Sequence, residues 1–434
     1  MNTLLRRTAR WALLLCFSLG NLLLSVPALA QRPDTVRLSL RDAEQIFLEK
    51  NLSLVAARYD IDINKALAKQ AALWDNPILE TDQNIYSNKR FFEHGKDASG
   101  NPVGQYFIQV QQLIKTAGKR SKLMDMAASN TRLAELQFGE LMRTLKYQLR
   151  ADYYQSAVLQ EQRKLLLNQL QTLQKLQTGM QAQLTLGNIA QKEYLRVQSL
   201  VIGIQQDLTD NQRDLWDVQT ELKTLLQITS NSFVQTEPVS VAVSPDTLRT
   251  DQLIEKARQY NTAYLIQQET LQYQQKNLLY QQALRVPDIM IGPEYDHNSN
   301  YTPRYVGLSI SLPLPLLNKN QGNIKAARIS VKQQETNLVQ AGDKLTNDVQ
   351  GALLKLYATA QTQLPDYKQF YTAYSQLMDK MAQSYQQRQI SLVEFADFFD
   401  NYREMISKQN NQQLNYLLSI EELNYQAGTD VIHP

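Results

Sequence analysis

The stretch "VGLSISLPLPLLNKNQGNIKAAR", residues 306–328, begins with the pattern of a β-strand and ends with that of a helix. Its first apolar side chains alternate with small or polar ones, so they share one face of a strand: Val306, Leu308, Ile310 and Leu312. Pro313 and Pro315 cannot donate to a sheet ladder, and the polar turn 318–322 follows them. A strand with one apolar face that stops abruptly at a long helix fits the inner edge of a membrane, where the environment of the chain changes abruptly.

The first thirty residues, "MNTLLRRTARWALLLCFSLGNLLLSVPALA", have the three parts of a secretory signal. A basic start is followed by an apolar stretch and by an A-x-A cleavage site at residues 28–30. We expect residues 1–30 to be a signal peptide that is removed before Gln31; the alternative is an uncleaved anchor. The single cysteine, Cys16, lies in this segment after two leucines, where a lipoprotein signal has a small residue. We therefore expect no lipid attachment, and no disulfide or thiolate metal ligand in the mature chain.

Composition excludes several classes of protein. The chain has 434 residues and a mean hydropathy of -0.41, which is too polar for a bundle of membrane helices. Its formal net charge of +3 comes from Arg6, Arg7 and Arg10, so 45 minus 3, or 42, basic residues face 42 acidic ones in the remainder. A nucleic-acid binder would carry a basic stripe, so we expect no nucleic-acid partner.

The chain contains an internal repeat, which suggests two similar halves. "ALWDNPILE" (72–80) corresponds to "ALRVPDIMI" (283–291), "GKRSKLMDMA" (118–127) to "NKNQGNIKAA" (318–327), and "NIAQKEY" (188–194) to "QISLVEF" (389–395). We expect a first repeat at 31–227, a second at 249–428 and a short tail at 429–434. Residues 228–248, rich in Ser, Thr and Pro, are predicted to be a linker at mid-molecule.

Heptad patterns predict one long helical hairpin in each half, at 119–227 and at 322–428. In the first, apolar residues recur in steps of three and four, with only Asn211 polar among them: Tyr194, Val197, Val201, Ile204, Leu208, Leu215, Val218, Leu222 and Leu225. Their partner is the preceding helix, which follows the same steps. If residues 119–184 form one helix, it is about 100 Å long. No compact domain has that length.

Four segments of about ten residues are predicted to be strands, at 78–86, 105–114, 288–296 and 305–312, each apolar on one side and polar on the other. This is the pattern of membrane β-strands; the alternative is the edge of a soluble sandwich. Four strands cannot close a barrel, and an open edge in hydrocarbon leaves backbone groups unpaired. We therefore expect an oligomer, and a trimer with a twelve-stranded barrel is favoured because it is wide enough to continue into a helical tunnel.

The expected fold class is thus mainly α with membrane β, and at this point the sequence resembles the TolC family of outer-membrane efflux ducts. The resemblance covers essentially the whole mature chain. It is most specific in "PDIMIGPEYD" (287–296) and "VGLSISLPLPLLNKNQG" (306–322), and includes the turns "LGNIAQKEY" and "RQISLVEF". The second half is most similar to the heavy-metal efflux branch. The resemblance implies a homotrimer in the outer membrane with a helical tunnel in the periplasm, an inner-membrane pump, of RND type by preference, and a periplasmic adaptor.

The resemblance also implies roles for particular residues. The helical tips would contact the adaptor: Leu186, Gly187, Asn188 and Ile189, and Arg388, Gln389, Ile390 and Ser391. Gly187 suits a turn with positive φ, whereas the second tip lacks this glycine and has Gln389 there, so we make no prediction for the geometry of its turn. Asp379 is the candidate for a gate near the second tip.

A duct needs no chemistry of its own, and the sequence has neither a nucleophile motif nor a phosphate loop nor metal-ligand spacing. We expect no enzyme, no cofactor and no metal site. The polar strand faces would line the barrel with acids and favour cations: Glu80, Asp82, Asp288, Glu294 and Asp296. The alternatives are the outer-membrane component of type I protein secretion, and a periplasmic adaptor or structural coiled-coil protein.

Overall fold

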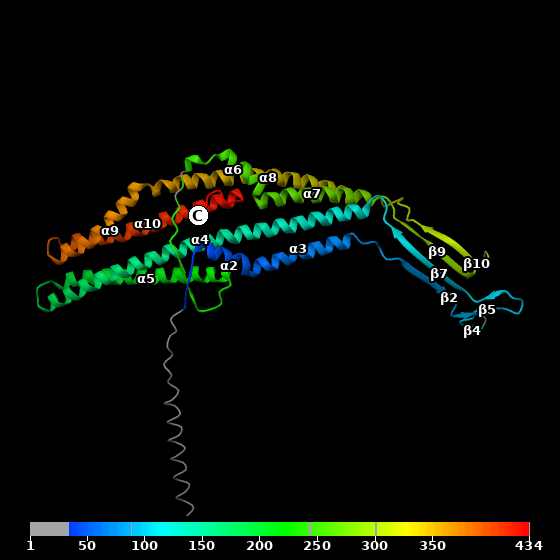
Figure 1. Ribbon diagram of the computed structural model, residues 1–434, viewed down its shortest axis with the longest axis horizontal. Coiled ribbons are helices and arrows are strands. Elements are labelled where there is room, and N and C mark those ends of the chain that lie inside the picture. The colour runs from blue at the N-terminus through cyan, green and yellow to red at the C-terminus, as the bar shows by residue number, and fades with distance from the viewer. Residues whose placement is uncertain (1–33, 88, 242, 244, 300–301, 434) are drawn as a thin grey trace, which may run out of the picture.

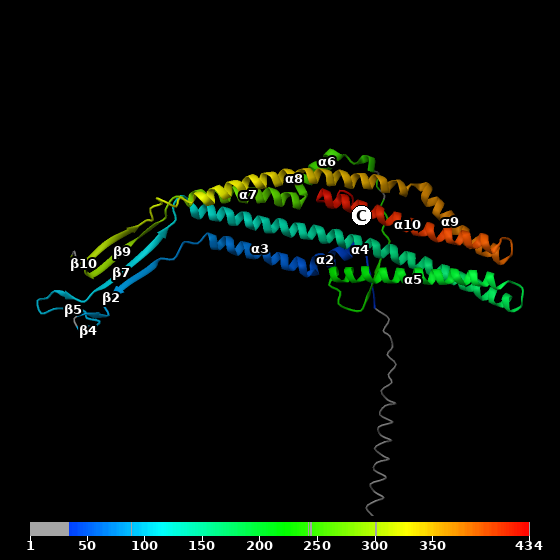
Figure 2. The same ribbon diagram turned by 180° about the vertical axis from the view of Figure 1, so that it is seen from behind.

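The structure is a computed structural model that describes residues 34–433, apart from residues 88, 242, 244, 300 and 301. The predicted signal peptide, residues 1–30, lies outside the described residues. The molecule is elongated. Long helices run side by side along it, the strands lie beyond one end of them, and two helical turns lie at the other end (Figure 1, and from behind in Figure 2).

The first half leads from short helices through strands into one hairpin of two long helices. Its elements are β1 (Thr35–Leu38), α2 (Leu40–Lys50), α3 (Leu52–Ala71), β2 (Ile78–Gln83), β3 (Tyr86–Ser87), β4 (Arg90–Phe91), β5 (Gly95–Lys96), β6 (Pro102–Val103), β7 (Tyr106–Ile114), α4 (Lys119–Thr185) and α5 (Gln191–Leu226). Helix α4 has 67 residues. It is unbroken because the sequence has no proline between Pro102 and Pro238.

The second half repeats this order after the connecting segment. Its elements are β8 (Phe233–Thr236), η1 (Pro245–Thr247), α6 (Thr250–Tyr260), α7 (Thr262–Ala283), β9 (Ile289–Asn298), β10 (Pro303–Ser311), α8 (Gln321–Ala360), η2 (Gln361–Gln363), α9 (Pro365–Gln386) and α10 (Leu392–Ala427). Each half contains a hairpin of long helices, but the first arm of the second one is interrupted. Leu364 precedes Pro365 with an extended ψ of 149°, as the proline ring requires, and α9 begins anew at that proline.

The four predicted strands form one antiparallel sheet in the order β10-β9-β7-β2 among the described residues. The helices beside the sheet form a row in the same order, because α4 lies between α3 and α7, and α7 lies between α4 and α8. Each strand therefore has the same place in the sheet as the helix joined to it has in the helical layer. The outer members of this single layer are α3 with β2 on one side and α8 with β10 on the other.

Three clusters of buried apolar side chains hold the helices together. One near the helical turns joins both hairpins through residues such as Leu173, Ile204, Phe395 and Phe399. The other two lie at mid-length: one is built mainly from the first half but includes Leu417 of α10, and the other is built from the second half. None of the described helices combines the length and the apolarity of a transmembrane helix.

The segment predicted as a linker, residues 228–248, is more ordered than expected. It contains β8, which pairs in parallel with β1 from Thr35↔Phe233 to Leu38↔Thr236, and the short helix η1. Buried Gln219 accepts the N–H of Val234 and donates to its carbonyl. The prediction missed this strand because its four residues carry no strong alternation of their own. The loop after β2 is also more ordered than the sequence predicted, because it forms the small hairpins β3–β4 and β5–β6.

Candidate functional site

The four-stranded sheet has two chemically different faces, which the register defines. One face is mostly apolar and exposed: Leu79, Thr81, Ile108, Val110, Ile291, Tyr295, Val306, Leu308 and Ile310. The opposite face is mostly polar: Glu80, Asp82, Phe107, Gln109, Gln111, Glu294, Asp296, Tyr305 and Ser309. The alternation predicted for each strand is thus in phase across all four strands, so the apolar residues form one continuous surface.

The polar face carries hydrogen bonds between strands. The Gln109 amide donates to Glu294 Oε2 at 2.8 Å, the Gln105 amide to Asp296 Oδ2 at 3.5 Å, and the Gln111 amide to Ser309 Oγ at 3.3 Å. Of the predicted lumen residues, Glu80, Asp82, Glu294 and Asp296 share this face. Their role as lumen acids stays a prediction, but the structure does bring them together.

Asp288, the fifth predicted lumen acid, lies just before β9 and is already neutralised. Lys119 Nζ is 2.6 Å from its Oδ1, and the Thr116 N–H donates to the same oxygen at 2.9 Å. Lys119 is buried, so this ion pair ties the start of α4 to the start of β9. Asp288 therefore acts as a joint between strand and helix rather than as a free charge.

Aromatic side chains gather at the loop end of the apolar face. Tyr106 stacks on His297 with ring centroids 4.8 Å apart and lies 5.7 Å from the Tyr295 ring. Tyr305, in contrast, is on the polar face, because it pairs with Asp296. Its ring covers Gly307, where a Cβ would come within 2.5 Å of it.

The two helical turns lie side by side and have the same backbone. In the first, the Gly187 N–H donates to the Leu184 carbonyl and the Asn188 N–H to the Gln183 carbonyl, both at 2.9 Å. In the second, the corresponding bonds run from Arg388 to Tyr385 and from Gln389 to Ser384, again at 2.9 Å. This is the Schellman pattern, in which one residue adopts positive φ.

The residue with positive φ in the second turn is Arg388, not Gln389, which we placed opposite Gly187. Its φ is 59°, compared with 74° for Gly187. The repeat of 188–194 in 389–395 already aligns Arg388 with Gly187, so Gln389 was misplaced by one residue. Ser391 then caps α10, since its Oγ accepts the Glu394 N–H while the Glu394 carboxylate accepts the Ser391 N–H.

A groove of about 590 Å³ lies between the two turns and includes both predicted tip segments in part. Apolar side chains of α4, α9, α10 and both turns form much of its wall: Leu176, Met180, Ile189, Tyr385, Ile390 and Leu392. Leu186 is exposed beside it. The predicted gate residue, Asp379, is exposed on α9 and has no ion pair within the described part of the chain. Its role stays a prediction.

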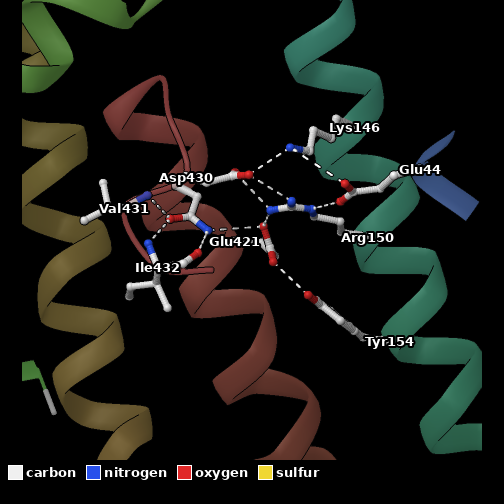
Figure 3. A network of polar contacts seen from close by, with 9 residues as sticks. Glu44, Lys146, Arg150, Tyr154, Glu421, Asp430, Val431 and Ile432 are labelled. Carbon is white, nitrogen blue, oxygen red and sulfur yellow. Dashed lines mark hydrogen bonds and ion pairs between the residues drawn. The ribbon is translucent and has the colours of Figure 1, made fainter. Parts of the chain in front are cut away.

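At mid-length, a buried arginine joins the two halves. Arg150 of α4 lies among three carboxylates (Figure 3): Nε is 2.5 Å from Glu44 Oε1, Nη1 is 2.7 Å from Glu421 Oε2, and Nη2 is 3.0 Å from Asp430 Oδ2. These acids come from α2, α10 and the segment after α10. Tyr154 donates to Glu421 at 2.8 Å. Sequence reasoning missed this network, although an arginine beside the buried aromatics Tyr153 and Tyr154 was a signal.

The charges of this network are fixed by their neighbours. Burial alone would lower the pKa of Arg150, but the carboxylates of Glu421 and Glu44 more than offset that effect and raise it. Burial also raises the pKa of Tyr154, and the Glu421 carboxylate raises it further. Burial would raise the pKa of Asp430, yet Lys146 and Arg150 hold it below its usual value. Arg150 and Asp430 thus stay ionised together.

A second buried carboxyl, Asp152 of α4, forms no ion pair with any residue that the structure describes. Its Oδ1 accepts from the Gln148 amide at 2.8 Å, while its Oδ2 is buried without a hydrogen-bond partner. Burial, and the nearby Glu221 carboxylate of α5, raise the pKa of Asp152 to about 7. The contact between the two arms of the first hairpin therefore contains a group that titrates near neutral pH.

Within the part of the chain that the structure describes, no three His, Cys, Asp or Glu side chains lie close enough together to hold a metal ion. His94 and His297 each contact the Tyr106 ring, His94 edge-on and His297 stacked on it. The features that remain as candidate functional surfaces are the two-faced sheet and the pair of helical turns.

No family model matches the sequence, and no curated protein matches it. Solved structures do match. The Campylobacter jejuni CmeC outer membrane channel aligns with a TM-score of 0.70 at 11% identity, covering 91% of this chain and 87% of that chain. VceC, an outer membrane protein of Vibrio cholerae, aligns with 0.69 at 14% identity, over 90% and 96% of the two chains. The open state of the Neisseria gonorrhoeae MtrE outer membrane channel gives 0.67 at 14% identity, over 90% and 89%.

Each of these alignments covers about nine-tenths of the chain, and they confirm the fold class predicted from the sequence. Over nine-tenths of its length, the chain therefore has the fold of the TolC-family outer-membrane channels.

Proposed function

We propose that the protein is the outer-membrane exit duct of a tripartite efflux system, working as a homotrimer. Three sheets would close a twelve-stranded barrel in the outer membrane, and the three helical layers would form a tunnel through the periplasm. The duct conducts cargo passively and needs no catalytic residue. Small toxic compounds or metal cations are the proposed cargo. An inner-membrane pump and a periplasmic adaptor would supply it, with the adaptor contacting the two helical turns.

The observation that carries this proposal is the two-faced sheet with two open edges. Within the described residues, β2 pairs only with β7 and β10 only with β9. In hydrocarbon, each unpaired backbone group costs several kcal/mol, so the edges must find partners. The strands alternate in direction from β2 to β10, so β10 of one copy runs antiparallel to β2 of the next and the apolar faces stay in phase.

The outer helices support the same closure. The side of α3 away from α4 carries an exposed apolar stripe at helical spacing: Leu52, Val55, Tyr59, Ile63 and Leu67. The start of α8, at the opposite edge of the layer, carries the exposed Ile329. The apolar stripe of α3 would thus be covered by α8 of the neighbouring copy.

The barrel interior would be the polar face, lined by Glu80, Asp82, Glu294 and Asp296. Four carboxylates in each of three copies make a strongly negative lumen, which concentrates cations and repels anions. Asp288 adds no free charge there because Lys119 neutralises it. Cation selectivity is therefore the electrical property that the proposal requires.

The test is the conductance of the mature protein in a planar lipid bilayer, after native mass spectrometry of the same detergent extract. We expect a trimer, and a reversal potential in a potassium chloride gradient that indicates cation selectivity. Replacing the lumen acids, as Glu80→Gln, Asp82→Asn, Glu294→Gln and Asp296→Asn together, should bring that potential toward zero.

The matched control is Asp251→Asn with Glu255→Gln on α6, two exposed acids far from the sheet. It should leave the selectivity unchanged. A monomer that stays folded without detergent would refute the duct. A conducting trimer whose selectivity does not respond to the lumen variants would refute only the lumen assignment.

A further inference from the structure

The four connections between strands and helices lie at one level along the molecule, where the sheet meets the helical layer (Figure 1). We name them the collar, defined as residues 72–77, 115–122, 284–288 and 312–320. The collar is the level at which the apolar sheet face ends. Its surface should therefore match whatever medium borders the inner side of the membrane.

Apolar side chains of the collar are unusually exposed. In the segment after β10, Leu314 is 68% exposed, Leu316 75% and Leu317 93%. Other exposed members come from the remaining connections: Leu73, Trp74, Leu284, Val286 and Leu312. Scattered exposed apolar residues are ordinary, but so many at one level mark a surface that contacts another apolar phase.

The collar also carries cations that lack counter-charges. Arg120, Lys122, Arg285 and Lys319 make no ion pair within the described residues. The two acids of the collar are already paired with other lysines, because Lys115 Nζ lies 3.0 Å from Asp75 Oδ2 and Lys119 Nζ lies 2.6 Å from Asp288 Oδ1. The collar therefore presents an uncompensated positive charge beside its apolar side chains.

Trp74 combines both properties in one place. Its ring is 61% exposed, and the Arg120 guanidinium lies over it at 4.6 Å from the ring centroid. Arg120 also donates to the Ala72 carbonyl at 2.9 Å, which fixes the pair at the end of α3. A tryptophan with a cation on its face suits the boundary between hydrocarbon and headgroups, where its ring is in the apolar phase and the charge in the polar one.

We propose that the collar binds the anionic phospholipid headgroups of the membrane leaflet that borders the helical end of the molecule. Its leucines and Trp74 enter the acyl boundary, and Arg120, Lys122, Arg285 and Lys319 bind phosphates. Each such cation near an anionic leaflet favours binding. The inference rests on the proposed function, because it needs the sheet to lie in a bilayer.

A second copy of the chain is a weaker candidate for this surface. Neighbouring copies in a ring would bring their own collars to the same level, with the same free cations and the same occupied acids. Such a contact could cover some leucines, but it would add positive charge instead of neutralising it. Anionic lipid supplies the missing negative charge and the apolar phase together.

The chain offers a clean optical test. Of its three tryptophans, Trp11 lies in the predicted signal peptide and Trp216 on α5, where it contacts Phe233. In the mature trimer, Trp216→Phe leaves Trp74 as the only reporter. We would reconstitute it in vesicles of phosphatidylcholine and phosphatidylglycerol, with either lipid carrying brominated acyl chains. At equal mole fraction, brominated phosphatidylglycerol should quench Trp74 about twofold more than brominated phosphatidylcholine.

Charge variants establish the cause of that preference. Arg285→Gln with Lys319→Gln should reduce the quenching ratio toward one. The control, Lys256→Gln with Arg258→Gln on α6, removes the same charge from exposed sites far from the collar and should leave the ratio as it was. Equal quenching by both lipids in the unsubstituted collar would overturn the selection of anionic headgroups.

A second reporter separates this inference from the proposed function. Leu308→Trp, combined with Trp74→Phe and Trp216→Phe, places the only tryptophan on the apolar sheet face. If this position is quenched and Trp74 is not, the sheet lies in lipid while protein covers the collar, and the collar proposal fails alone. If neither is quenched, the sheet is not in the bilayer and both proposals fail.

Discussion

The two halves of the chain repeat their backbone more faithfully than their residues. At three places a left-handed residue recurs in both halves, and in each pair only one member is glycine: Gly118 and Asn320, Gly187 and Arg388, and Gln227 and Gly428. A non-glycine residue in this conformation costs about 1–2 kcal/mol. The comparison teaches that hydrogen bonding and packing around the turns define their geometry, and that glycine only lowers the conformational energy of the left-handed residue.

Polar burial, by contrast, differs between the halves. The first hairpin buries Arg150 and Asp152 on α4, where Glu221 of α5 approaches Asp152. In the second hairpin, the counterpart of Glu221 is Glu422, because the two are separated by the same number of residues as Gly187 and Arg388. Glu422 Oε1 lies 2.6 Å from Nζ of the exposed Lys355 and so forms a surface ion pair. Arg150 and Asp152 of α4 are thus buried and structural, whereas the Glu422–Lys355 pair of the second hairpin lies at the surface. The following experiments break or sharpen this contrast.

The largest effect is expected from Arg150→Met. The change leaves Glu421 buried without its cation and removes a partner from Glu44 and Asp430, so the free energy of unfolding should fall by about 3–5 kcal/mol. Denaturant unfolding of the detergent-solubilised mature protein, followed by circular dichroism, measures it. Lys355→Met, in the second half, should cost less than about 1 kcal/mol because that pair is exposed. Equal losses for both would contradict the contrast.

The next effect depends on pH. Because the pKa of Asp152 is raised to about 7 in the folded protein, folding favours its protonated form. Its contribution to stability is fully present below the unfolded pKa of about 4 and is lost as pH rises through 7. Asp152→Asn should therefore stabilise the protein at pH 8 by about 2 kcal/mol and change little at pH 4. Thermal melts at both values check this.

Glu422→Gln is the matched variant for that pH test. Its carboxylate faces Lys355 rather than another acid, so its removal should not produce a gain that appears only at high pH. If Asp152→Asn gave the same change at pH 4 and pH 8, the buried carboxyl would not be titrating in this range.

A smaller effect is expected at the turns. Arg388→Gly should stabilise the second turn by about 1 kcal/mol through relief of backbone strain, and Gly187→Arg should cost about as much. No atom lies within 4 Å of the Cβ position at Gly187, so only the backbone term is tested. The two variants should shift the melting temperature in opposite directions; shifts in one direction would mean that side-chain contacts dominate.

The smallest effect concerns the helices that follow the turns. Ser391 caps α10, whereas Ala190 stands at the start of α5 with no side-chain cap. Ser391→Ala should destabilise by about 1 kcal/mol, and Ala190→Ser should recover a few tenths in the first half. Amide hydrogen exchange in the first turn of each helix resolves effects of this size.

Local pattern predicted most of the fold. Alternation along 306–312 indicated both faces of a strand, and Pro313 and Pro315 marked its end within a residue or two. Steps of three and four from Tyr194 predicted α5, and polar Asn211 does lie in the seam, where it donates to the Leu159 carbonyl at 3.1 Å. These features depend on near neighbours, so a single sequence contains them.

Features that depend on distant neighbours were missed. Strand β8 exists because β1 and Gln219 supply its partners, and Phe233–Thr236 alone does not predict it. Asp288 looked like a lumen residue until Lys119 proved to be beside it. Within the candidate site, alternation along the strands was enough to predict that Glu80, Asp82, Glu294 and Asp296 lie on one face. The positive φ of Arg388 could be seen only in the backbone of the structure.

The network around Arg150 has a consequence for the order of folding. Its acceptors Glu421 and Asp430 lie 271 and 280 residues further along the chain. The guanidinium therefore has only Glu44 as a partner until the second half has been assembled and the segment after α10 has docked on α4. The first hairpin can form early from its own apolar seam, but it keeps an incompletely matched cation. Docking of the second half therefore completes the ion pairs of Arg150 and stabilises the first hairpin.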